Sequence, residues 1–395
     1  MPETLNLKQL SSFVAGSAAA FRSVTKLQPV GGEGDKVFPA TYAGGAYSTE
    51  KRLLDGASAD CVLLDSVQSQ ANRAEEALKS ALERNRIRLP LITVDFGEAN
   101  KSLRSEIQNL TTLDVPHRLA DAILRDSALL DGTRFSKSTY AQRWSRATVW
   151  NATPVYELCP TALLFGMWGS PEKPGGLGAK FERAYVSEIV AVDVVGLDNL
   201  QKRFGYRIDP LNASKNVLVK PSEDGTFKLD GKVRPSEINH GNIPFDSANS
   251  GVRFRYAEQT TVVSLGALRK LRFPVAGDDS TSRNDAGRTV LAALGLCAGV
   301  FASEAGTSLR SRCHLWPTEE RVWELLEKPG AETKKYRISG DQAAALLSEA
   351  VEAAELAGLR WNTEPITLKP TPELVELVKR SQEEAAKEKG EGKSE

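Results

Sequence analysis

The sequence DCVLLDSVQSQANRAEEALKSALERNR, residues 60–86, contains a strand signal followed at once by a helix signal. Its first six residues form an apolar run of strand length. Asp65 or Ser66 is suited to cap the start of a helix. Apolar side chains then recur at helical spacing, at Ala74, Ala77, Leu78, Ala81 and Leu82. The stretch therefore predicts a strand that runs directly into an amphipathic helix.

Segments on both sides extend this pattern. A strand is predicted within residues 12–30, and two more within residues 187–195 and 260–268. Residues 284–301 repeat apolar side chains at helical spacing and predict a well-buried helix, after which residues 309–317 have the pattern of a short strand. The resulting β-α-β-β-α-β order predicts an α+β protein with a ferredoxin-like core and large insertions.

The overall composition is that of an ordinary globular protein. Of 395 residues, 41% are hydrophobic and 26% charged, which excludes disorder of the whole chain. The 51 basic residues balance the 51 acidic ones, so the net charge argues neither for nor against a nucleic-acid ligand. No apolar stretch approaches the ~20 residues of a membrane span, and the N-terminus lacks the pattern of a signal peptide. We expect a cytoplasmic protein.

Motifs for metals, cofactors and hydrolytic catalysis are missing from the sequence. The four cysteines form no CxxC pair, and the three histidines lie at no zinc-finger spacing, so neither a structural zinc site nor a disulfide framework is predicted. In GGLGAK, Lys180 is followed by Phe181 where a phosphate loop needs Ser or Thr. Neither GxGxxG nor GxSxG occurs. Nucleotide binding and hydrolysis through these motifs are therefore not predicted.

A polar stripe follows the predicted helix beside its apolar one. Ser69, Asn72, Arg73 and Glu76 fall at i, i+3, i+4 and i+7. Short polar and amide side chains beside an arginine at a helix start suit a phosphate backbone, and Gln70 joins these candidates. A solvated surface is the alternative explanation.

Two further basic patches are candidates for binding phosphates. Residues 116–126 predict a short helix on which Arg118 and Arg125, seven residues apart, share one face, and His117 lies beside them. Arg310 and Arg312 alternate with apolar neighbours in the predicted strand and are expected on one face of it. A pair of surface salt bridges explains these two arginines equally well.

Six segments together resemble one known family: 38–47 (FPATYAGGAY), 63–78 (LLDSVQSQANRAEEAL), 115–127 (VPHRLADAILRDS), 151–170 (NATPVYELCPTALLFGMWGS), the SEI that starts at Ser187, and 309–315 (LRSRCHL). In this order they resemble the RAMP-superfamily backbone subunit of type I-U, or I-G, CRISPR Cascade effector complexes, the Csb-one family of the Cas-seven group.

The resemblance implies a modified RNA-recognition-motif fold with a thumb-like hairpin and no cofactor. Copies of such a subunit polymerise head to tail along CRISPR RNA, beside other Cascade subunits, and present the guide for pairing with target DNA in antiviral defence. The implied role is non-catalytic. The alternative is a metal-dependent endoribonuclease that uses Asp121, Asp126 or another loop carboxylate. A purely structural protein subunit explains the basic patches poorly.

Two segments are candidates for the thumb. Residues 220–250 contain Asp-Gly twice and are the preferred candidate, because Asp-Gly favours hairpin turns. Residues 170–185 form a basic glycine-rich loop, and we expect Trp168, Lys180 and Arg183 to line an RNA groove there. The alternative for Trp168 is packing in the core.

The chain is expected to divide into three parts. Residues 1–330 would form the RNA-binding domain with its insertions. Residues 331–375 would form a C-terminal helical extension, because they contain the acidic amphipathic stretch DQAAALLSEAVEAAELAGL. The charged residues 376–395 are expected to be a disordered tail.

Overall fold

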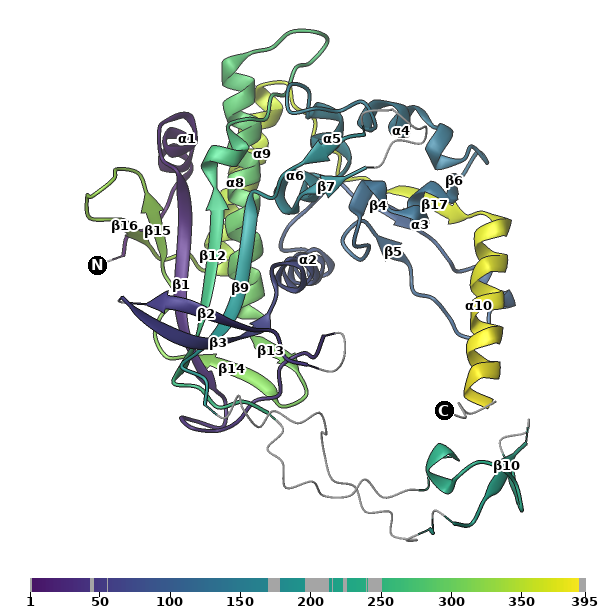
Figure 1. Cartoon of the computed structure of the whole chain (residues 1–395). Helices are drawn as coiled ribbons and strands as arrows, with labels where there is room; N and C mark the ends of the chain where they lie inside the picture. The colour runs from purple at the N-terminus through teal and green to yellow at the C-terminus, as the bar shows by residue number, and fades with distance from the viewer. Residues whose placement is uncertain are drawn as a thin grey trace.

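A nine-stranded antiparallel sheet forms the centre of the molecule (Figure 1). The computed structural model describes residues 2–42, 46–54, 56–169, 178–195, 213–214, 216–222, 226–238, 240 and 251–390. The sheet runs in the order β13 (Thr307–Arg310), β14 (Cys313–Pro317), β1 (Ala20–Pro29), β12 (Tyr256–Ser264), β9 (Tyr185–Val192), β3 (Ala57–Asp65) and β2 (Thr49–Leu54). Two further strands, β15 (Trp323–Leu326) and β16 (Lys334–Tyr336), extend it beside β1.

Helices cover one face of this sheet. They are α1 (Leu7–Ala15), α2 (Val67–Glu83), α8 (Thr281–Glu304) and α9 (Gly340–Leu356), of which α8 is central and contacts the other three. A Cβ atom at Gly295 of α8 would lie 2.9 Å from Cγ1 of Val263, so glycine allows the helix to lie close to β12. By length and composition α8 could cross a membrane, but 78% of its apolar window is buried inside the protein. It is a core helix, apolar all round because it is surrounded by protein.

A second, smaller unit is built mainly from the insertion between α2 and β9. Its four-stranded sheet has the order β5 (Leu110–Thr111), β4 (Ile92–Val94), β17 (Ile366–Pro370) and β6 (Ser127–Leu129). Here β17, from the C-terminal part, pairs in parallel with β4 and antiparallel with β6. Short helices accompany this sheet: α3 (Ala122–Arg125), α4 (Thr139–Trp144), α5 (Thr153–Leu158) and α6 (Thr161–Phe165). Residues 331–375 therefore contribute two strands as well as the helix α9.

The α+β class is confirmed, and most of the predicted elements are present. The predicted strand within residues 12–30 occupies β1, the one at 60–65 lies in β3, and the two long helices are α2 and α8. Residues 376–390, expected to be disordered, lie in the helix α10 (Pro372–Gly390). Residues 391–395 lie outside the described part of the chain.

Two predictions of local structure were wrong. Residues 309–317 are not one strand: β13 and β14 form a hairpin whose turn contains Arg312 with φ 58°. Residues 116–126 are not one helix, because Arg118, with φ 53°, starts a separate turn η3 (Arg118–Ala120), and Asp121 then caps α3. A left-handed residue interrupts regular structure, and alternation or periodicity in a sequence does not reveal it.

Two small hairpins lie outside both sheets. Met167–Trp168 (β7) pairs antiparallel with Lys180–Phe181 (β8), and Val219–Pro221 (β10) pairs antiparallel with Phe227–Leu229 (β11). The candidate 220–250 thus contains nearly all of a described pair of strands, whereas the candidate 170–185 contains β8 and begins after β7. Parts of each candidate, residues 170–177, 223–225, 239 and 241–250, lie outside the described residues.

Candidate nucleic-acid interface

Three segments that are far apart in the sequence meet at the β13–β14 turn. The Phe38 amide donates to the Arg312 carbonyl at 3.0 Å, and Nη1 of Arg310 donates to the Pro39 carbonyl at 2.9 Å. From α2, Arg73 donates to the carbonyls of Ser308 and Leu309 at 3.2 and 2.6 Å. The meeting point therefore unites residues from three of the segments that carry the family resemblance.

Cations surround the ring of Phe38 at this point. The guanidinium of Arg312 lies 4.7 Å from the ring centroid, and Nζ of Lys36 lies 5.6 Å from it. Arg310 and Arg312 are exposed, and within the described part of the chain no ion pair joins either of them, or Lys36, to a carboxylate. We call Lys36, Phe38, Arg310 and Arg312 the Phe38 cluster. Unpaired exposed cations beside an aromatic ring suit a phosphate backbone and an unstacked base.

Arg310 and Arg312 come together in a different way from the one predicted. They were expected on one face of a single strand, but Arg310 ends β13 and Arg312 lies in the turn. Their shared contact is the segment at Phe38 and Pro39. Sequence reasoning used FPATYAGGAY only as a family motif and missed Lys36 and Phe38 as site residues. A lysine two positions before an aromatic residue was the only local signal, and it is weak.

Two of the candidates on α2 hold the scaffold beneath this cluster. Nε of Arg73 pairs with Asp65 at 2.9 Å, so all three of its nitrogens are engaged once the β13 carbonyls are counted. Gln70 is buried: it donates to Asp65 at 2.6 Å and accepts from Ser187 Oγ at 2.9 Å and from Gln259 Nε2 at 2.7 Å. These contacts give both side chains a positioning role toward β13 and β9.

The other two candidates on α2, Ser69 and Asn72, lie in surroundings that are less favourable for a phosphate. Ser69 donates its backbone N–H to the Ser66 cap at 3.3 Å. Asn72 is exposed and lines an open pocket of about 650 Å³. The pocket also contains one lysine, Lys79, and three carboxylates, those of Glu76, Glu83 and Asp114. Because acidic groups predominate there, this side of α2 disfavours a polyanion.

Arg118 forms a buried ion pair in place of the expected surface patch. It donates to both carboxylate oxygens of Glu75 at 2.7 Å and to the Gly166 carbonyl at 2.9 Å. Its guanidinium also lies 5.3 Å from the ring centroid of Phe165. The expectation that Arg118 and Arg125 share a helical face was therefore wrong. Arg125 is exposed and pairs with the neighbouring Asp126 at 2.7 Å.

The β7–β8 hairpin presents a second exposed group. The side chain of Trp168 is 68% exposed, which excludes core packing, and Nζ of Lys180 lies 4.5 Å from the centroid of its ring. Arg183 is exposed and approaches Gly166, whose φ of 83° and lack of a side chain make room for it. His117 is exposed beside the buried Arg118. Trp168 and Lys180 thus repeat the pairing of aromatic ring and cation seen in the Phe38 cluster.

Taken together, the α+β scaffold and the Phe38 cluster define a protein with a basic, aromatic surface suited to single-stranded nucleic acid. Residues 21–195 match the family model described as CRISPR-associated protein GSU0053. The matched range contains every segment of the resemblance except residues 309–315. Over these residues the chain is similar to a CRISPR-associated family, which supports the recognition made from the sequence.

Comparison with solved structures finds the crystal structure of Thermofilum pendens Csc2. It is 13% identical, the alignment covers 96% of this chain and 80% of that chain, and the TM-score is 0.28. A TM-score this low does not establish a common fold. No curated protein sequence matches the chain.

Proposed function

We propose that the chain is a non-catalytic backbone subunit of a type I-G CRISPR effector complex. It polymerises along CRISPR RNA and presents the guide for pairing with target DNA, in the cytoplasm and together with other subunits. The observation that carries this proposal is the Phe38 cluster, where segments of the family resemblance meet. It presents the exposed Arg310 and Arg312, which pair with no carboxylate in the described part of the chain. Such a surface binds the backbone and leaves the reading of bases to the guide.

The order of strands supports a modified RNA-recognition-motif core within the larger sheet. Along the chain, β1 leads to α2, then β9, β12, α8 and β14, while in space the order is β14-β1-β12-β9. The middle strand β12 is antiparallel to both of its neighbours. A ferredoxin-like β-α-β-β-α-β unit has this arrangement, with β2, β3, β13 and the second unit as additions to it.

The non-catalytic role agrees with the local contacts of the two carboxylates that the alternative would use. Asp121 caps α3 by accepting from the backbone N–H of Ile123 at 3.0 Å, and it also accepts from that of His117 at 3.2 Å. Asp126 pairs with Arg125. In the described ranges no three His, Cys, Asp or Glu side chains form a group that could hold a metal ion.

The hairpin of β10 and β11 is the proposed thumb. It lies apart from both sheets (Figure 1), and its side chains Phe227 and Leu229 are 47% and 64% exposed. An exposed apolar pair on one strand of a hairpin suits insertion between bases, because unstacked bases bind aromatic and apolar side chains.

The proposal is tested by expressing the full chain together with a CRISPR array and purifying it. We expect the ratio of absorbance at 260 to that at 280 nm to show bound RNA, and R310A/R312A to lower this ratio. The matched control R84A/R104A removes two exposed arginines elsewhere on the surface and should retain the RNA. Wild-type protein free of RNA would contradict the proposal. Magnesium-dependent cleavage of labelled RNA would favour the endoribonuclease instead.

A further inference from the structure

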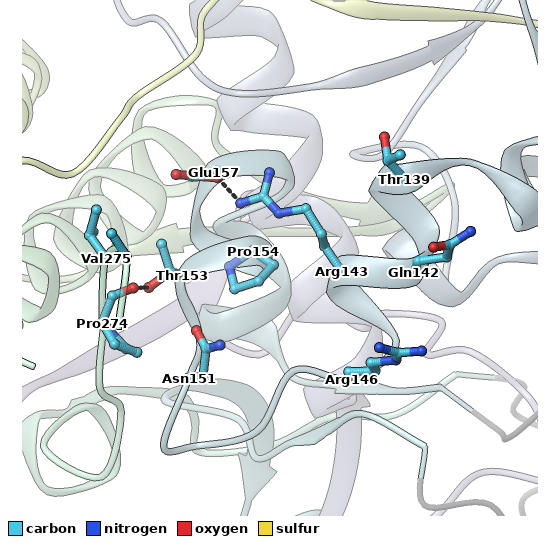
Figure 2. A pocket seen from close by; sticks show the side chains of 11 residues that line it. Thr139, Gln142, Arg143, Arg146, Asn151, Thr153, Pro154, Glu157, Pro274 and Val275 are labelled. Atoms are coloured by element: carbon cyan, nitrogen blue, oxygen red, sulfur yellow. Dashed lines mark hydrogen bonds and ion pairs between the residues drawn. The ribbon is translucent and has the colours of Figure 1, made fainter. Parts of the chain in front are cut away.

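An open pocket of about 600 Å³ lies between α4 and α5 (Figure 2). Hydrogen-bond donors reach it from α4 and the loop that follows, and prolines form an apolar wall: the donors are Gln142, Arg143, Arg146 and Asn151, and the wall contains Pro154 and Pro274. Figure 2 shows Arg143 and Arg146 to the right of Pro154, and Asn151 below it to the left. None of these residues belongs to the Phe38 cluster or to the β7–β8 hairpin.

The pocket has an excess of positive charge. Arg143 pairs with Glu157 at 2.5 Å, which neutralises the carboxylate in the wall. Arg146 is exposed, and no ion pair joins it to a carboxylate in the described part of the chain. One unpaired guanidinium with amide donors nearby is an arrangement that binds a phosphodiester.

An exposed tryptophan stands directly beside this pocket. Trp150 precedes the pocket residue Asn151, is 65% exposed, and has the guanidinium of Arg272 at 4.8 Å from its ring centroid. The loop that carries it is fixed to the segment before α8, because the Ala152 amide donates to the Arg272 carbonyl and the Arg272 amide donates to the Val149 carbonyl, both at 2.8 Å. Trp150 is therefore held in place while most of its surface faces solvent, as a stacking platform requires.

The helix α4 links this pocket to the β7–β8 hairpin. A Cβ atom at Gly169, the residue after Trp168, would lie 3.1 Å from Cζ3 of Trp144 at the end of α4. The hairpin with Trp168 and the loop with Trp150 therefore both adjoin this short helix, and each of these exposed tryptophans has a cation at its ring. The Phe38 cluster lies far from it, since β13 and β14 occupy the opposite end of the molecule from α4 and α5 (Figure 1).

We propose that this pocket binds a phosphodiester of a single-stranded nucleic acid whose adjoining base stacks on Trp150. Arg146 and the amides hold the phosphate, and the proline wall contacts the sugar. The proposal rests on the proposed function, and it adds a second contact at the other end of the subunit. Guide RNA and target DNA share this chemistry, so the experiment distinguishes them.

The test uses the full chain and labelled single strands of RNA and DNA with the same sequence, followed by fluorescence anisotropy at several salt concentrations. We expect W150A to weaken binding roughly tenfold, a typical loss for one stacked base. R146A should flatten the slope of log affinity against log salt by about 0.7, the value for one phosphate on a single strand. The matched controls are W316A, which removes a tryptophan that is 62% exposed, and R84A.

Each outcome decides the proposal. A loss confined to RNA supports it and identifies the guide as the ligand, a loss confined to DNA supports it and identifies the target strand, and equal losses support binding of either strand. If W150A and R146A bind like W316A and R84A, the proposal is wrong. In that case the R310A/R312A variant still tests the proposed function, because Arg310 and Arg312 do not line this pocket. Loss of RNA from that variant would support the proposed function even though the pocket proposal is wrong.

Discussion

Arg118 and Glu75 form a two-pronged ion pair inside the protein, with both N–O distances at 2.7 Å and side-chain exposures of 8% and 2%. The pair joins α2 to the turn η3, and a third bond from Arg118 to the Gly166 carbonyl extends the connection toward the β7–β8 hairpin. Three elements that carry segments of the family resemblance are therefore held together by one guanidinium.

Removing Arg118 should destabilise the protein strongly. In R118A the Glu75 carboxylate remains buried without its partner, and breaking such a pair costs about 3–5 kcal/mol. Urea unfolding measures the change in the free energy of unfolding. The control R125A removes an arginine whose side chain is 59% exposed and should cost about 1 kcal/mol or less. Similar small losses in both variants would contradict the structural role of Arg118.

Each cation of the Phe38 cluster should make its own contact with a phosphate. We expect K36A, R310A and R312A each to weaken the binding of unrelated RNA sequences equally and to flatten the salt slope by about 0.7. F38A should also weaken binding, because Arg312 and Lys36 lie over its ring. Filter binding across a salt series measures both effects. An unchanged slope in the triple variant would remove these cations from the interface.

The regular elements could be predicted from the sequence because they depend on local patterns. The strand and helix of residues 60–86 are present as β3 and α2, since apolar spacing and a capping serine specify them within one segment. The sheet order was not accessible in this way, because pairing β17 with β4 joins segments more than 270 residues apart. The spacing of apolar residues within a segment gives no information about a contact between two distant segments.

The site was only partly predictable for a related reason. Basic residues could be found from spacing, but spacing does not distinguish an exposed arginine from one that is neutralised by a distant carboxylate. Arg118 is neutralised by Glu75 across 43 positions, whereas Arg310 and Arg312 meet Pro39 and Phe38 from more than 270 positions away. Tertiary contacts therefore decide which of the predicted cations remain available to RNA.

The four cysteines should be unreactive in the folded protein. All are buried, and burial raises the pKa of every thiol, to about 12 for Cys313. At pH 8 a thiol with that pKa is ionised to about one part in ten thousand, against roughly a quarter for an unfolded cysteine with a pKa near 8.5. A raised thiol pKa also means that stability falls as pH rises above ~8.5, where the unfolded chain ionises first.

Ellman's reagent at pH 8 measures this directly. We expect negligible reaction under native conditions and release of the equivalent of four thiols in urea. The free energy of unfolding should decrease between pH 8.5 and 10. One thiol that reacts rapidly in the native protein would show that its surroundings open locally and would contradict the burial at that position.

The proposed thumb should set the spacing of subunits on RNA without contributing to the fold. The β10–β11 hairpin pairs within itself, at Val219 with Leu229 and Pro221 with Phe227, and belongs to neither large sheet. Deleting residues 225–245 should therefore leave the urea midpoint nearly unchanged and preserve binding through the Phe38 cluster. A nuclease footprint on long RNA should lose its regular period, because no hairpin then displaces a base at each subunit boundary. F227A/L229A is the milder test, since it removes the exposed wedge and keeps the hairpin. If both variants retain a periodic footprint, the thumb lies elsewhere, and the β7–β8 hairpin with Trp168 becomes the next candidate.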